Sequence, residues 1–309
     1  MVTGGTGFIG QRLVEKLSDY NTKIIVLGRN RRKSKIVEEL VDKGRVEFLT
    51  CDLSETSQVE EANRIVRQNF FLLHLASYML GSSLEEGYNA IKSIAINVEA
   101  VLRSVDVFKQ KIIGIVYIST VDVYGTPTYL PIDEKHSTNP LTFYGASKLA
   151  GEKYLQVLAS NENIPLTILR FSEVYGPGEW HRKAIPNFIR DIISDKPPTI
   201  FGDGSDVRDY VYLDDAVGAI ISSFLERKEG IYNIAGGQGI SIRELATKLI
   251  KLAGSELSPN FLPSAKPSSR FVFDISKAQK ELDFYPQFSL DEGLKAEIDW
   301  FRSRRDNVR

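Results

Sequence analysis

The chain of 309 residues has one cysteine, Cys51, so it cannot form an internal disulfide. It has no excess charge of either sign, since 39 Lys and Arg stand against 40 Asp and Glu, and this balance excludes a global field that attracts nucleic acid or an anionic membrane. No apolar run approaches the roughly 18 residues of a membrane span, and the amino terminus lacks the pattern of a signal peptide. We therefore expect a cytoplasmic protein that binds neither nucleic acid nor membrane.

Metal chemistry has little support in the sequence. There are three histidines, His74, His136 and His181, and no metal-ligand spacing links them. His74 ends an apolar run, where we expect it to pack beside a bound ligand, while the other two fall in polar segments. Cys51 is expected to be a packed strand residue rather than a nucleophile. The sequence predicts no metal site.

What the chain does have is an alternation of strand-like and helix-like segments. Short apolar runs predict buried strands at 23–28, 45–53, 70–76, 111–120 and 165–171. Helical apolar spacing predicts helices at 11–20, 35–44, 90–108 and 147–160. Apolar strands separated by helices indicate a parallel sheet covered on both faces. The predicted fold class is α/β, with a doubly wound parallel sheet.

A glycine-rich turn stands at the very start of the chain. Gly4, Gly7 and Gly10 have the spacing that lets a strand turn sharply into a helix while backbone N–H groups approach a pyrophosphate. A purely structural turn is the alternative, but the amphipathic helix that follows favours dinucleotide binding. A central strand needs about four to six residues, and Met1 to Thr3 supply half of one at most. We hypothesise that an apolar run precedes Met1 in the natural protein.

Beyond about residue 175 the regular alternation of strand-like and helix-like segments is interrupted. Residues 176–206 and 258–271 are rich in Pro, Gly and charge, which predicts long loops of a smaller lobe. A helix at 210–225 and a strand at 230–236 are expected to rejoin the sheet. The predicted domains are therefore a Rossmann domain at 1–170 with 210–236, and an interwoven carboxyl-terminal substrate lobe at 171–209 and 237–309.

Tyr144 and Lys148 are four residues apart in a predicted helix and so share one face. A nearby ammonium group stabilises a phenolate, which would lower the pKa of Tyr144 from about 10 and make it a general base. Ser119 and Thr120 end a predicted strand, and ligands bind at the carboxyl ends of parallel strands. The alternatives are a surface Tyr–Lys pair and a hydroxyl that only caps a turn.

A series of motifs runs through the whole chain in a fixed order: GGTGFIG, Asp52 in CDLS, HLAS, Asn97 in INVEAV, STVDVYG, YGASKLAGE, LRFSEVYGPG, FGDGSDVRDYVYLDD, YNIAGG and FDISKAQKEL. This series resembles the extended short-chain dehydrogenase/reductase family and, more narrowly, its nucleotide-sugar epimerases and dehydratases, such as UDP-glucose 4-epimerases. The resemblance implies an NAD(P) cofactor and a small nucleotide-sugar substrate. It also implies a homodimer packed through the helices at 90–108 and 147–159. The alternative is that the apolar faces of these helices are buried in the core of a single subunit.

The resemblance further implies roles for individual residues. The implied catalytic residues are Tyr144, Lys148 and Thr120. The implied cofactor contacts are Gly4, Gly7, Phe8, Ile9, Gly10, Arg29, Asp52, Leu53, Leu75, Ala76, Tyr144 and Lys148. The implied substrate contacts are Ser119, Thr120, Glu173, Asn187, Arg208 and Arg270. Bidentate bonding makes an arginine suited to a diphosphate, while solvated surface charge is the alternative for both arginines.

Two departures from the family pattern bear on the reaction. Relatives that eliminate water carry an acidic pair after the catalytic Thr, but here the pair is Val121 and Asp122, which argues against a 4,6-dehydratase. Glu173 stands where many relatives have Asn against the substrate phosphates, and a carboxylate there would be repelled. We expect that Glu173 pairs with an arginine such as Arg170, or that the substrate is held differently.

The type of nicotinamide cofactor is the last open point. The second predicted strand ends in Gly28 and is followed by Arg29, Arg31 and Arg32, without the acid that binds a ribose 2′-hydroxyl. This pattern leans towards NADP, and the alternative is that these arginines are solvated and NAD binds. The expected function is epimerisation of a nucleotide-linked sugar at the 4-position, by oxidation and re-reduction. An NADPH-dependent reductase of a keto-sugar or ketone is the main alternative, ahead of a dehydratase or a non-catalytic cofactor-binding protein.

Overall fold

The structure is a computed structural model, and it describes residues 1–79, 90–179, 181, 183–265 and 267–304. Its centre is a sheet of seven strands in which every neighbouring pair is parallel. In spatial order the strands are β10 (Gly230–Ile234), β6 (Leu166–Phe171), β5 (Ile112–Thr120), β4 (Phe70–His74), β1 (Val2–Thr3), β2 (Ile24–Gly28) and β3 (Val46–Thr50). The strands are apolar because both faces of this sheet are covered.

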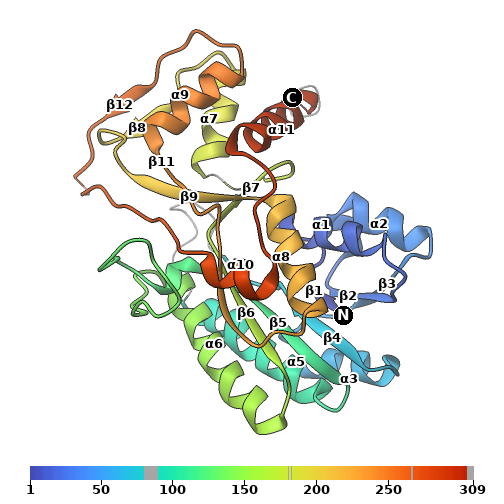
Figure 1. Cartoon of the computed structure of the whole chain (residues 1–309). Helices are drawn as coiled ribbons and strands as arrows, with labels where there is room; N and C mark the ends of the chain where they lie inside the picture. Colours follow the sequence, from blue (N-terminus) through green and yellow to red (C-terminus); the bar gives the residue numbers. More distant parts are fainter. Residues whose placement is uncertain (80–89, 180, 182, 266, 305–309) are drawn as a thin grey trace.

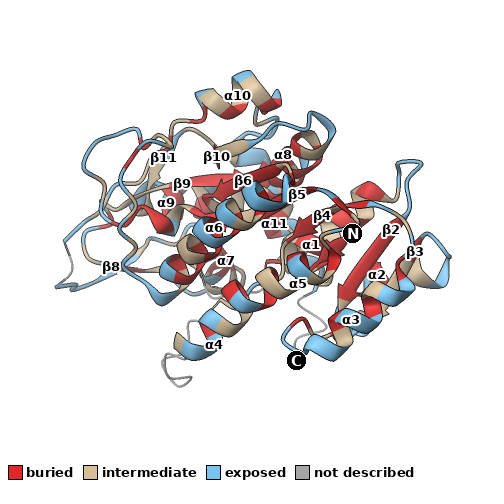
Figure 2. Ribbon diagram, turned by 90° about the horizontal axis from the view of Figure 1, so that it is seen from below, coloured by how far each residue is buried: buried red, intermediate tan, exposed pale blue. Residues whose placement is uncertain are grey.

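Helices cover both faces of the main sheet (Figure 1). One face carries α1 (Phe8–Leu17), α2 (Lys35–Asp42), α8 (Leu213–Leu225) and α10 (Ser276–Leu282). The other face carries α3 (Thr56–Ile65), α4 (Ala90–Ile94), α5 (Ala100–Phe108) and α6 (Phe143–Glu162). Figure 2 shows the sheet buried between these layers, with the outer sides of α3, α4 and α6 exposed. The predicted doubly wound α/β fold is confirmed.

Strand β1 is short but central. Its two residues pair with β2 on one side and with β4 on the other. Met1 is buried, and its nitrogen donates to the carbonyl oxygen of Phe71 at 2.8 Å. The glycine-rich turn therefore starts from a fixed point in the middle of the sheet.

A smaller lobe lies beyond the carboxyl edge of the sheet (Figure 1). It contains a sheet of β7 (Glu173–Tyr175), β9 (Val207–Tyr212) and β11 (Gly239–Ser241), and a strand pair of β8 (Thr199–Phe201) and β12 (Asn260–Leu262). Its helices are α7 (Ala184–Ile193), α9 (Ile242–Leu252) and α11 (Leu290–Ser303), which share their own apolar core. The lobe thus has more regular structure than the long loops predicted for residues 176–206 and 258–271.

The chain returns to the main sheet as predicted, because β10 pairs with β6. The helix predicted at 210–225 begins only at Leu213, since Tyr210 to Tyr212 belong to β9 of the smaller lobe. The boundaries expected for the two domains stay a prediction. Over the ranges that the structure describes, no helix has both the length and the apolar character needed to cross a bilayer.

Candidate active site

The glycine-rich turn joins β1 to α1 at the carboxyl edge of the main sheet (Figure 1). Gly4 has a φ of 69°, and a Cβ atom on it would lie 2.6 Å from the backbone nitrogen of Ala76, so a side chain does not fit there. Gly7 precedes α1, and no side chain of the described residues caps this helix. Its first N–H groups therefore point out of the turn without side-chain partners, as an anion site requires. The predicted contacts Phe8, Ile9 and Gly10 lie in the first turn of α1.

The end of β4 packs against this turn. The backbone nitrogen of Leu75 donates to the carbonyl oxygen of Thr3 at 3.2 Å, and that of Ala76 donates to the Thr3 hydroxyl at 3.3 Å. His74 is buried with its Nδ1 atom 3.0 Å from the same hydroxyl, which is the packed position expected from the sequence. Burial, assisted by the charge of Lys148, lowers the pKa of His74 to about 3, so its ring is neutral at pH 7.

Residues predicted to bind the adenosine end follow β2 and β3, which are neighbours in the sheet. Arg29 and Asp52 face each other at 3.9 Å, and Leu53 is buried behind them. The two other arginines also face carboxylates: Arg31 lies 3.4 Å from Asp42, and Arg32 lies 3.8 Å from Glu38. A 2′-phosphate would have to displace these carboxylates, which disfavours the NADP preference expected from the arginines.

Tyr144 and Lys148 lie one turn apart in α6, whose start is capped by Thr142 accepting from the backbone nitrogen of Gly145 at 3.0 Å. The Tyr144 side chain is half-buried, and its hydroxyl bonds to Ser77 at the end of β4. Lys148 is buried, and its Nζ atom lies 4.1 Å from the centre of the Tyr117 ring. The pair is therefore held between the helix and the carboxyl ends of β4 and β5.

The charge state of this pair differs from the expectation. Burial and the negative charge of Asp122 raise the pKa of Tyr144 to about 12, although the Ser77 bond lowers it. Burial also lowers the pKa of Lys148 to about 7, against an opposing influence of Glu152. The prediction that Lys148 lowers the pKa of Tyr144 is wrong, because burial of the phenol raises this pKa and outweighs the lowering influence of the Ser77 bond.

Ser119 and Thr120 end β5 and point in different directions. The Ser119 hydroxyl is buried and donates to Glu152 at 2.5 Å, and its role as a substrate contact stays a prediction. Glu152 also accepts from Arg170, at 3.1 Å from Nε and 2.7 Å from Nη2. Thr120 instead lies at the sheet edge, where its Oγ1 atom accepts from the backbone nitrogen of Asp122 at 3.2 Å.

Glu173 starts β7 in the smaller lobe, and its counter-charge is Arg208 at 3.8 Å. The proposed pairing with Arg170 is wrong, because Arg170 is buried against Glu152 on the face of the sheet that α6 covers. The guanidinium of Arg208 also lies 5.1 Å above the ring of Phe271. Arg270 is exposed, and it lies close to Arg208 because its backbone bridges to the neighbouring residue Val207. The two predicted substrate arginines therefore lie in one neighbourhood.

Asn187 lies apart from these arginines, in α7. It accepts from Arg190 at 3.1 Å and lines a cavity of about 930 Å³. The other lining residues are Ala184, Phe188, Arg190, Asp191, Thr199, Ile200, Phe201 and Ile242. Phe201 is 66% exposed, so its ring is available to a flat ligand. The expected position of Asn187 near a substrate base stays a prediction.

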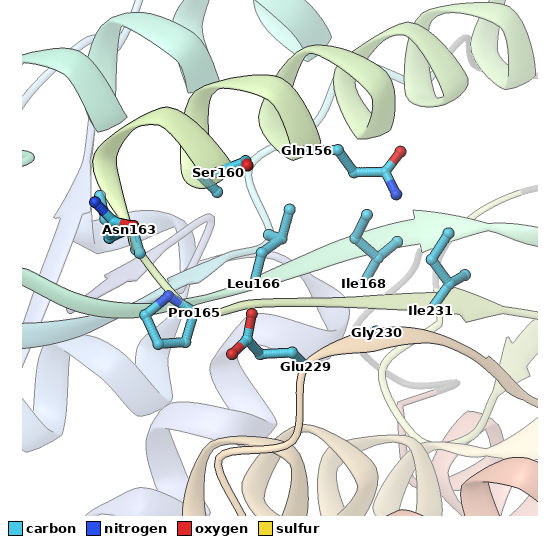
Figure 3. Close-up of a pocket in the computed structure, with 11 residues that line it drawn as sticks. Gln156, Ser160, Asn163, Pro165, Leu166, Ile168, Glu229, Gly230 and Ile231 are labelled. Carbon is cyan, nitrogen blue, oxygen red and sulfur yellow. The ribbon is translucent and has the colours of Figure 1, made fainter.

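A second cavity, of about 580 Å³, lies at the opposite end of the main sheet (Figure 3). Gln156 and Ser160 of α6 face Leu166 and Ile168 of β6 across it, and Glu229 stands at its rim. Strands β6 and β10 begin at this cavity, whereas Thr120 and the glycine-rich turn lie at the opposite edge, where the strands of the sheet end. It contains none of the predicted site residues.

Several residues that build the site were not predicted. Asn97, in a π-helical turn (Ala95–Glu99), accepts from the Ser77 hydroxyl at 3.1 Å and donates to the Ser147 hydroxyl at 2.9 Å. It thereby joins the end of β4 to α6, the helix of Tyr144 and Lys148. Glu152 stands one turn beyond Lys148, and this spacing of four residues was a signal that sequence reasoning could have used. Tyr117 gave no such signal, because its contact with Lys148 crosses from a strand to a helix.

Comparison with known proteins gives one consistent result. The profile of the NAD dependent epimerase/dehydratase family matches residues 1–235. A Methanocaldococcus jannaschii protein with the provisional name UDP-glucose 4-epimerase is 32% identical, with 98% of each chain covered. A crystal structure of UDP-glucuronic acid 4-epimerase from Bacillus cereus with UDP-glucuronic acid and NAD has a TM-score of 0.86 at 29% identity, with 98% of each chain covered. UDP-glucose 4-epimerase from Thermotoga maritima with UDP-glucose has a TM-score of 0.85 at 27% identity over the same shares.

All of the predicted site residues lie within the described ranges. Within those ranges, no group of three or more His, Cys, Asp or Glu side chains is arranged to hold a metal ion. Nothing in the comparisons supports the lean towards NADP, since the Bacillus cereus structure contains NAD. With a family profile over most of its length and the matching fold, the chain belongs to the NAD dependent epimerase/dehydratase family.

Proposed function

We propose that this protein is an NAD-dependent 4-epimerase of a UDP-linked sugar. The observation that carries the proposal is the convergence of Tyr144, Lys148 and Thr120 at the carboxyl edge of the sheet, beside the glycine-rich turn and facing the arginines of the smaller lobe. The named activities of the Methanocaldococcus, Bacillus and Thermotoga relatives support the same reaction. Ligands bind at this edge in open parallel sheets.

The chain's residues fit a dinucleotide. Gly4 leaves no room for a side chain against Ala76, and the uncapped start of α1 offers backbone N–H groups to a pyrophosphate. Asp52 and Arg29 would border the adenosine, and Lys148 would hold the ribose next to the nicotinamide. When bound, NAD would supply the hydride acceptor.

Tyr144 is the proposed general base. At pH 7 its phenol is neutral in this structure, because burial and Asp122 raise its pKa to about 12. A positive charge next to the phenol favours the phenolate, and Lys148, one turn along α6, is the side chain that we propose to supply it. The phenolate then accepts the proton of the sugar 4-hydroxyl and returns it after the sugar has turned. Thr120 is placed to bond the same oxygen.

The substrate is held in two places. Arg208 and Arg270 would bind the diphosphate, and Glu173, paired with Arg208, keeps that guanidinium oriented. The cavity beside Asn187 and Phe201 would take the nucleotide base. This division places the sugar between the arginines and Tyr144, which is where an alcohol has to lie to reach the base.

The alternative of an NADPH-dependent reductase makes a different prediction. An epimerase converts UDP-glucose and UDP-galactose into each other without net use of cofactor, whereas a reductase consumes its reduced cofactor stoichiometrically. We expect the purified protein with NAD to reach the same sugar equilibrium from either side, as followed by NMR, with no growing absorbance of reduced nicotinamide. Tyr144→Phe should lower the rate by about 10² to 10⁴-fold. A stoichiometric change in cofactor would favour the reductase.

We also propose a homodimer. Ile91 and Ile94 of α4 and Tyr154 and Val157 of α6 are 77%, 46%, 60% and 63% exposed, although all four are large and apolar. The two helices contact each other, so these side chains belong to one surface. We expect sedimentation to show a dimer and Tyr154→Glu to shift it to monomer. The single buried cysteine, Cys51, supports a reducing, cytoplasmic location.

A further inference from the structure

Asp122 places a carboxylate directly beside the proposed catalytic groups. Its backbone nitrogen donates to Thr120 Oγ1 at 3.2 Å. Its carbonyl oxygen packs on α6 next to Tyr144, where a Cβ atom on Gly145 would lie 2.7 Å from it. The Asp122 side chain is accessible to solvent, and its negative charge is one of the causes of the raised pKa of Tyr144. Asp122 therefore stands directly beside Thr120 and the helix turn of Tyr144, where a substrate of Tyr144 has to arrive.

Glu173 adds a second negative charge on the same side. Strands β5 and β6 are neighbours in the sheet, and Thr120 pairs with Phe171. Glu173 comes two residues after Phe171, so it lies just beyond the end of the sheet at which Thr120 stands. Partial desolvation by the surrounding protein raises the pKa of Asp122, and the charge of Glu173 raises it further. The two carboxylates therefore repel each other electrostatically.

The nearby cations are engaged by other acids. Arg208 lies 3.8 Å from Glu173 and 3.4 Å from Asp206, and Lys183 lies 3.9 Å from Glu179. Asp122 forms no ion pair with any residue that the structure describes, although Lys183 and Arg208 are near enough to lower its pKa somewhat. Among the residues that the structure describes, the carboxylate of Asp122 thus has no ion-pair partner of its own.

On the basis of the proposed function, we propose that Asp122, supported by Glu173, selects UDP-sugars with an uncharged hydroxymethyl group at C6 and rejects uronic acids. Tyr144 acts on the oxygen at C4, and C6 is attached to the next ring carbon, so the C6 group lies within a few bond lengths of the reacting centre. A hydroxymethyl group there can donate a hydrogen bond to Asp122. A C6 carboxylate would place two like charges side by side in a partly desolvated site, which costs binding. In this respect the chain would differ from its Bacillus cereus relative, which was crystallised with UDP-glucuronic acid.

The test measures binding and turnover separately. Calorimetry with the NAD-loaded protein gives the dissociation constants of UDP-glucose and UDP-glucuronate, and initial rates give kcat/KM for both. We expect UDP-glucose to be favoured at least tenfold in each measurement. Asp122→Asn should reduce this preference at least tenfold, and Glu173→Gln should reduce it less. Because the ratio compares two substrates on one enzyme, an effect of the variant on the pKa of Tyr144 cancels.

Asp106→Asn is the matched control, since Asp106 is an exposed carboxylate of α5 that pairs with Lys109 far from this edge. It should leave the preference unchanged. Equal binding of the two sugars by the wild type, or an unchanged preference in Asp122→Asn, would overturn the inference. Selective binding without turnover of either sugar would support the selection by Asp122 while overturning the proposed epimerase activity, so the two failures are distinguishable.

Discussion

The ammonium group of Lys148 lies 4.1 Å from the centre of the Tyr117 ring, inside the protein and away from solvent. The ring belongs to β5 and the lysine to α6, so this contact joins the catalytic helix to the sheet. The ring face partly replaces the water that a buried cation loses. Even so, burial lowers the pKa of Lys148 to about 7, so the charged and the neutral form of this side chain are about equally populated at neutral pH.

Replacing Tyr117 should therefore shift the charge of Lys148. We expect Tyr117→Leu to lower the pKa of Lys148 further and reduce kcat/KM at pH 7 by about tenfold or more, since a desolvated cation–π contact contributes about 2 kcal/mol. The measurement is a pH profile of kcat/KM, in which activity should be lost on the alkaline side at a lower pH. Tyr117→Phe is the matched control, because it keeps the ring and removes only a hydroxyl whose bond to the Asn97 carbonyl is 3.4 Å long. Equal profiles for the Leu and Phe variants would contradict this role of the ring.

The buried pair of Glu152 and Arg170 should dominate the stability of this region. Glu152→Gln leaves the guanidinium buried without its counter-charge, which costs about 3–5 kcal/mol of the free energy of unfolding. Arg170 is 2% exposed, so water cannot replace the carboxylate. Urea unfolding gives the comparison. The double variant Glu152→Gln with Arg170→Met removes both charges and should be the more stable of the two, and a double variant less stable than Glu152→Gln would refute the argument.

Lys148 should also make stability depend on pH. Its pKa falls from 10.5 to about 7 on folding, so between these values the unfolded chain binds more protons than the native protein. The contribution of Lys148 to stability therefore rises with pH in this window, with a slope of up to about 1.4 kcal/mol per pH unit. We expect the free energy of unfolding of the wild type to gain on that of Lys148→Met between pH 7 and pH 9. Lys153→Met, at an exposed position of α6, should show no such trend. A difference that stays constant with pH would mean that Lys148 remains fully charged in the native protein.

The sheet could be predicted because its information is local. Runs such as those of β2 and β5 are apolar over their whole length, and only strands buried on both faces have that pattern. Helix α7 was missed because a Gly- and Pro-rich segment leads into it and Pro186 stands near its start. Pro186 is tolerated because it lies in the first turn, where the missing N–H has no helical partner.

Only part of the site could be predicted from the sequence, because spacing reveals contacts within one helix but not contacts between separate elements. Tyr144 and Lys148 share a helix face, so their spacing carries the signal. The partner of Glu173 could not be chosen by spacing, because Arg170 is close in sequence but points to the α6 side of β6, while Arg208 arrives from β9. Desolvation of Tyr144 was equally hidden, since it depends on which segments pack around the ring.

The most direct test of the whole account follows one hydrogen atom. UDP-glucose with deuterium at C4 is incubated in ordinary water with the protein and NAD, and the UDP-galactose formed is analysed by NMR and mass spectrometry. If C4 is oxidised and then reduced with the same hydrogen while Tyr144 exchanges only the hydroxyl proton, the product keeps its deuterium at C4. Product that has lost the label to solvent, or no UDP-galactose at all, would contradict 4-epimerisation of UDP-glucose by transient oxidation.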